Sequence, residues 1–103
     1  MYRKIEEKMP ELAALCFKHG VRRLALFGSG TGSRFDPATS DLDFLVEFKP
    51  MPPAEHAECY FGLMEDLERL LKIPVDLVEP EPIRNPYFRE SIEESQVVLY
   101  NAA

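Results

Sequence analysis

Two carboxylates, Asp41 and Asp43, stand two residues apart at the start of an apolar run that continues to Val46. On a β-strand, residues two apart lie on one face, roughly 6–7 Å from each other. Carboxylates so placed repel each other beside an apolar sheet unless a cation lies between them. Mg²⁺ fits hard oxygen ligands and a phosphorylated substrate. We therefore predict metal ligation, the alternative being a solvated strand face or a turn cap.

A small turn, Gly28-Ser29, follows a hydrophobic run and precedes Asp41 by a gap of eleven residues. Backbone N–H groups and a hydroxyl in such a turn can bind phosphates. Ser29 is alternatively an ordinary turn residue, and phosphate contact is the interpretation we favour. A further carboxylate, Asp76, stands alone between Val75 and Leu77. It is either an exposed strand residue or, as we predict, the third carboxylate of the same site.

Together these residues resemble the signature of the polymerase-beta-type nucleotidyltransferases. The similar segments are Gly20 with residues 21–29, residues 40–46 and residues 74–78. The short chain resembles the minimal branch of that family, whose members are often paired with a helical HEPN-type protein. The resemblance implies an α/β fold in which a small mixed β-sheet packs with helices, as in polymerase beta.

The resemblance also implies an activity: Mg²⁺-dependent transfer of NMP, from ATP or another NTP, to a hydroxyl. In that chemistry Asp41, Asp43 and Asp76 are the catalytic and metal-binding residues, and Gly28 and Ser29 hold the phosphates. The acceptor implied is a tyrosine on a HEPN-type toxin, with this chain as the antitoxin. The family commonly continues Gly-Ser-x-Ala-Arg-Gly, whereas this chain has Gly32 at the arginine position. Arg34 is the predicted substitute, and the alternative function is a catalytically idle module that neutralises its partner by contact.

The elements that must position these residues follow from hydrophobic periodicity and from proline and glycine. We predict strands over residues 21–27, 41–48, 75–78 and 96–100. Helices are predicted over residues 10–20, 54–72 and 85–94. In the long helix Phe61 and Met64 are expected in the core, and His56 on a solvated surface. His19 is expected to act as a cation at a helix C-terminus.

Length and charge set the remaining expectations. The chain has 103 residues, 46% of them hydrophobic, which is enough for one domain spanning residues 1–103. The net charge of −6 disfavours direct nucleic-acid binding, which depends on Lys and Arg. No apolar run is long enough for a membrane span, and the N-terminus does not resemble a signal peptide. We therefore expect a cytoplasmic protein. Cys16 and Cys59 are expected to be buried free thiols, the less favoured alternative being a disulfide between them.

Overall fold

The computed structural model describes residues 1–32, 35–80 and 96–102. Its sheet has the order β3-β2-β1-β4, in which β1 pairs antiparallel with both β2 and β4, and β2 pairs parallel with β3. The strands are β1 (Val21–Phe27), β2 (Leu42–Phe48), β3 (Val75–Val78) and β4 (Val97–Asn101). The predicted small mixed sheet packed with helices is therefore confirmed.

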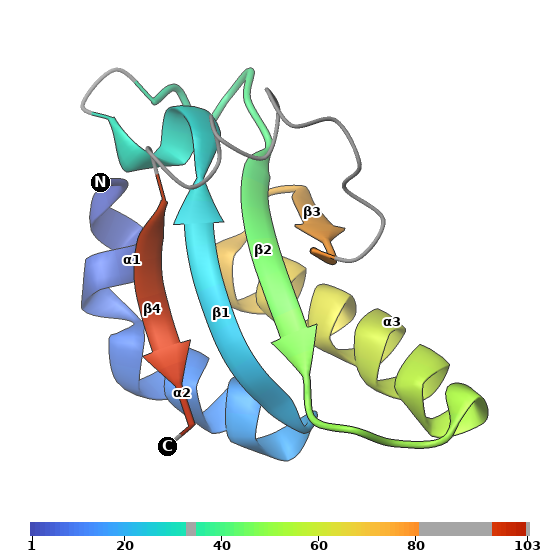
Figure 1. Cartoon of the computed structure of the whole chain (residues 1–103). Coiled ribbons are helices and arrows are strands. Elements are labelled where there is room, and N and C mark those ends of the chain that lie inside the picture. Colours follow the sequence, from blue (N-terminus) through green and yellow to red (C-terminus); the bar gives the residue numbers. More distant parts are fainter. Residues whose placement is uncertain (33–34, 81–95, 103) are drawn as a thin grey trace.

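The helices of the described residues lie behind the sheet in the view of Figure 1. They are α1 (Arg3–Glu7), α2 (Met9–Lys18) and α3 (Pro53–Leu71), and a short 3-10 helix, η1 (Gly28–Thr31), follows β1. The five-residue α1 was not predicted, because it buries only Ile5 among charged neighbours. The predicted helix over residues 85–94 and Arg34 lie outside the described residues.

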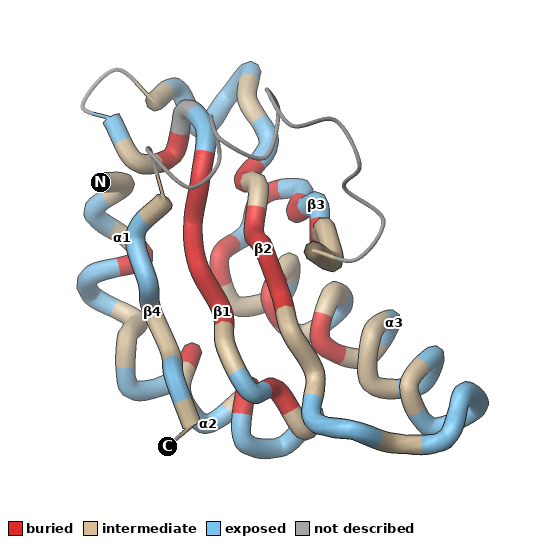
Figure 2. Tube along the Cα trace, in the orientation of Figure 1, coloured by how far each residue is buried: buried red, intermediate tan, exposed pale blue. Residues whose placement is uncertain are grey.

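The main core lies between the helices and the sheet (Figure 2). Alternate residues of β2 face it, namely Leu42, Phe44 and Val46, each 0% exposed. Leu63, Leu67 and Leu71 of α3 are buried against them. Because side chains alternate along a strand, Asp43, Leu45 and Glu47 point to the opposite face.

That opposite face carries a smaller apolar cluster, made of Ala25, Phe27 and Leu45 with Val78 packed against it. Three of its four residues come from β1 and β2, and the cluster contains no helical residue. Asp43, a candidate site residue, shares this face, since it pairs in register with Phe27. The face of the sheet turned away from the helices is therefore where the candidate site lies.

Several side chains differ from the sequence-based expectation. Phe61 is 63% exposed rather than buried, because it lies outside the stripe of α3 that buries Leu63, Leu67 and Leu71. His56 is not simply solvated, since its Nε2 lies 2.5 Å from Glu79 Oε1. Cys16 is buried as expected, but Cys59 is only partly buried, and both are free thiols.

His19 does stand at a helix end, as the C-cap of α2. Its side chain is only 12% exposed, however, and its Nε2 lies 2.7 Å from Asp66 Oδ2 on α3. The imidazole therefore joins two helices in addition to any effect on the helix dipole.

Candidate active site

Asp43 and Asp76 are direct neighbours across the parallel β2–β3 pair. Both strands begin at this end of the sheet, and paired residues project to the same face. Asp76 is exposed and Asp43 is partly buried. The sheet register thus brings together two carboxylates that are far apart in the sequence, on the face turned away from α1, α2 and α3.

The Gly28 turn lies directly against Asp43. Gly28 has a backbone φ of +75°, a conformation that L-residues with a side chain rarely adopt. A Cβ atom built at this position would lie 2.9 Å from Asp43 Oδ2. Glycine is therefore required here twice, by the backbone conformation and by the close approach of the carboxylate. Thr31 closes the turn by donating its hydroxyl to Gly28 O at 2.7 Å.

Negative charge accumulates around Asp43, where Asp76 and Asp41 are also close. Burial raises the pKa of Asp43, and the nearby charges of Asp76 and Asp41 raise it further. Among the described residues no Lys, Arg or His forms an ion pair with any of the three carboxylates. Carboxylate oxygens are the ligands that suit Mg²⁺, so the chemical type of these residues fits such an ion.

The structure brings the predicted residues together to different degrees. Asp41 is exposed and immediately precedes β2. Its charge contributes to the raised pKa of Asp43. Within the described part of the chain, no three His, Cys, Asp or Glu side chains form a group that could hold a metal ion. Ser29 lies in η1, but its side chain, like Arg34, is outside what the structure describes. Ligation by all three carboxylates and phosphate binding by Ser29 and Arg34 therefore stay predictions.

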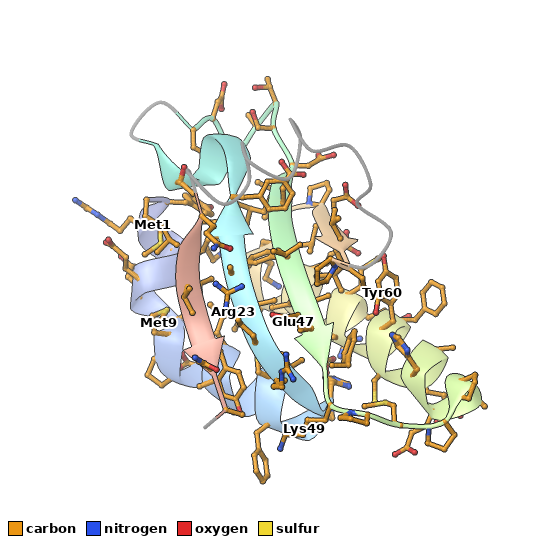
Figure 3. All side chains as sticks on the ribbon, in the orientation of Figure 1. Met1, Met9, Arg23, Glu47, Lys49 and Tyr60 are labelled. Carbon is orange, nitrogen blue, oxygen red and sulfur yellow. The ribbon has the colours of Figure 1, made fainter. Side chains whose placement is uncertain are left out.

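A separate hollow of about 490 Å³ lies toward the other end of β2. Its charged lining is largely paired internally: Arg22 Nη2 lies 3.1 Å from Glu47 Oε1, and His56 bonds Glu79. Figure 3 shows Arg23 beside Glu47, and Arg23 Nη1 lies 3.7 Å from Glu47 Oε2. This hollow includes none of the three aspartates, so we place the chemistry at the carboxylate edge rather than here.

Two side chains of α3 that sequence reasoning did not select contact the strand that carries Asp76. Tyr60 donates its hydroxyl to Leu77 O at 2.6 Å, and Glu68 Oε2 accepts the N–H of Val75 at 2.9 Å. In Figure 3 Tyr60 lies on the side of α3 nearer β3. Their eight-residue spacing on one helix face was a visible signal, but its target could not be read without the tertiary structure.

Residues 12–99 match the family model of the nucleotidyltransferase domain. The chain belongs to this family. No helix of the described residues is both long and apolar enough to cross a membrane.

Known proteins agree with this assignment. The chain is 40% identical over 83 residues to "Putative protein adenylyltransferase MJ1379" of Methanocaldococcus jannaschii, with 80% of each protein covered. It is also similar to the solved structure of a "putative minimal nucleotidyltransferase", at 29% identity and a TM-score of 0.72, covering 94% of this chain and 95% of that one. The fold alone is shared with a toxin–antitoxin structure with AMP-PNP, at 18% identity, a TM-score of 0.64, and coverage of 91% and 73%.

Proposed function

We propose that this protein transfers AMP from ATP to a protein hydroxyl, with Asp41, Asp43 and Asp76 as the catalytic carboxylates. The observation that carries the proposal is the pairing of Asp43 with Asp76 beside the Gly28 turn. The relatives named as protein adenylyltransferases support AMP as the transferred group and a protein as the acceptor.

The reaction is a substitution at the α-phosphorus of ATP. The acceptor oxygen forms a bond to that phosphorus, the bond to the bridging oxygen breaks, and pyrophosphate leaves with the bond electrons. Asp76, the more exposed of the paired carboxylates, accepts the proton of the attacking hydroxyl. Mg²⁺, held by Asp41 and Asp43, would supply charge neutralisation for the triphosphate. Gly28 and Ser29 would hold the phosphates of the leaving pyrophosphate.

The acceptor is proposed to be a tyrosine of a HEPN-type toxin, for which this chain acts as the antitoxin. The structural likeness to a toxin–antitoxin complex that contains AMP-PNP supports the idea of a toxin partner and an ATP-like substrate. The net charge of −6 suits a basic, RNA-cleaving partner. We place this reaction in the cytoplasm, where ATP and a toxin partner would both be available.

A second function is favoured by one residue, Gly32. Where the family commonly has an arginine in the phosphate loop, this chain has none at that position. A chain without a cationic phosphate clamp would neutralise its partner by contact alone. Arg34→Ala separates the two functions: loss of ATP affinity in calorimetry supports the active enzyme, and unchanged affinity supports the idle module.

The direct test is mass spectrometry of the partner that co-purifies with the chain, before and after incubation with ATP and Mg²⁺. The partner should gain the mass of one adenylyl group on a tyrosine. The matched control is the complex carrying Asp43→Asn, which should leave the partner unmodified. Neutralisation of the partner without any mass gain would instead establish the contact mechanism.

A further inference from the structure

The strand that carries Asp76 is the shortest of the sheet and lies at its edge. Leu42 N–H donates to Pro74 O, so the backbone polar groups of every second residue from Pro74 onward point toward β2. In a parallel pair the residues between them, Val75 and Leu77, direct their backbone N–H and C=O groups away from β2. Because β3 is an edge strand, no neighbouring strand bonds these outward groups, and other partners must do so.

Side chains of α3 bind two of these outward groups. Glu68 accepts the N–H of Val75 at 2.9 Å and Tyr60 donates to the carbonyl of Leu77 at 2.6 Å. The two bonds hold the residues immediately before and after Asp76. Both are partly buried, which shields them from competition with water.

A third contact extends the same row. His56 Nε2 lies 2.5 Å from Glu79 Oε1, just past the end of β3. His56, Tyr60 and Glu68 are separated by four and eight residues, so they lie on one stripe of the helix. They meet residues 79, 77 and 75 in reverse order, which means that one helix stripe runs along the outer edge of the strand.

From these contacts we infer that Tyr60 and Glu68 are positioning residues that fix Asp76 opposite Asp43. The inference rests on the proposed function, in which Asp76 takes part in catalysis. The two side chains bond the backbone on either side of Asp76. They act through the position of the strand and are not themselves proposed as catalytic groups. Loss of either bond lets the edge strand shift, and a small shift moves one carboxylate of the site relative to the other.

The charges around Tyr60 agree with this arrangement. Burial raises the pKa of its phenol, and the charges of Asp76 and Glu79 raise it further. The hydroxyl therefore keeps its proton at neutral pH and stays a hydrogen-bond donor to Leu77 O. The phenol thus lies close enough to the Asp76 carboxylate for that charge to raise the pKa of Tyr60.

The test compares Tyr60→Phe and Glu68→Ala with matched controls. Tyr100→Phe removes a phenol hydroxyl from β4, at the other edge of the sheet, and Glu65→Ala removes an exposed carboxylate from the same helix. Amide hydrogen exchange of Asp76 and Val78 should be roughly fivefold faster in the two test variants. The controls should exchange as the unmodified protein does.

Two further readouts connect the strand to the site. Mn²⁺, used as a spectroscopic substitute for Mg²⁺, should bind roughly tenfold more weakly to Tyr60→Phe and to Glu68→Ala. The kcat of adenylyl transfer should fall while the KM for ATP stays unchanged. Glu68→Gln keeps an acceptor oxygen and should restore exchange, Mn²⁺ affinity and kcat toward those of the unmodified protein.

The outcomes separate this inference from the proposed function. Test variants that match their controls in hydrogen exchange would overturn the inference, and so would faster exchange with unchanged Mn²⁺ affinity and kcat. If the unmodified protein binds no Mn²⁺ and transfers no AMP, the proposed function fails. Hydrogen exchange would even then show whether Tyr60 and Glu68 hold the strand.

Discussion

Asp43 and Asp76 face each other across the only parallel strand pair of the described sheet, with Gly28 against the Asp43 carboxylate. Two like charges in register destabilise a sheet. The pKa of Asp43 is accordingly raised, by burial first and then by Asp76 and Asp41. The close pair of carboxylates therefore lowers the stability of the fold rather than adding to it.

Replacing Asp43 with Asn should therefore abolish transfer while stabilising the protein. Removal of a like-charge cross-strand contact is expected to increase the free energy of unfolding by about 0.2–1 kcal/mol at pH 7. Calorimetric melting of Asp43→Asn, beside Glu65→Gln as a control at an exposed site, measures this. A marked fall in Tm would indicate a structural role for Asp43.

The raised pKa of Asp43 also fixes the sign of a pH effect. Because the folded state holds this proton more tightly than the unfolded chain, ionisation of Asp43 costs stability as pH rises from the unfolded value of about 3.9 through the folded pKa. Asp43→Asn lacks that loss. The difference in Tm between the two proteins should widen over this rise and then stay constant, and a constant difference at all pH values would contradict the assignment.

Gly28→Ala should impair both folding and the site. The left-handed backbone costs an L-residue about 1–2 kcal/mol, and the new Cβ would lie 2.9 Å from Asp43 Oδ2. We expect a lower midpoint of urea unfolding and a loss of ATP binding in calorimetry. Gly32→Ala, in the exposed part of the same loop, is the matched control. Equal effects of the two substitutions would refute the specific role of Gly28.

The contact between His19 and Asp66 gives a pH effect of opposite sign. Hydrogen bonding from His19 is the main cause of the lowered pKa of Asp66, and Lys18 also contributes. A lowered carboxyl pKa adds stability above the unfolded value of about 3.9, and this stability is lost as pH falls through the folded pKa.

Asp66→Asn should thus destabilise the protein at pH 7 by about 1 kcal/mol, or roughly 4–8 °C in Tm. The difference from the unmodified protein should shrink on acidification. Glu65→Gln, at the neighbouring exposed position, should change neither the Tm nor its pH dependence. A difference that persists undiminished in acid would mean that packing, rather than charge, links α2 to α3.

Local sequence signals predicted the bounds of the strands, whereas the exact register between them came only from the tertiary structure. Gly20 and Gly28 bracket the apolar run of β1, and Pro74 precedes β3, so residues 21–27 and 75–78 were predicted with the bounds that the structure has. The register of Asp43 with Asp76 depends on how α3 returns the chain to the sheet, which no local pattern encodes.

The long helix illustrates the same limit. Its periodicity predicted the helix to within one residue at each end, yet Phe61 is exposed and His56 has a partner. Periodicity tells which residues share a face, but not how far the core extends beneath that face. The contacts of Tyr60 and Glu68 with β3 required the tertiary structure for the same reason.

The central claim, adenylyl transfer at the Asp43–Asp76 edge, is tested most directly by the fate of isotopic label from ATP. The chain and its co-purified partner are incubated with Mg²⁺ and ATP labelled at either the α- or the γ-phosphate. The α-label should become covalently attached to the partner, the γ-label should leave in pyrophosphate, and Asp43→Asn should attach neither. Attachment of the γ-label, or equal attachment of the α-label by Asp43→Asn, would contradict the account.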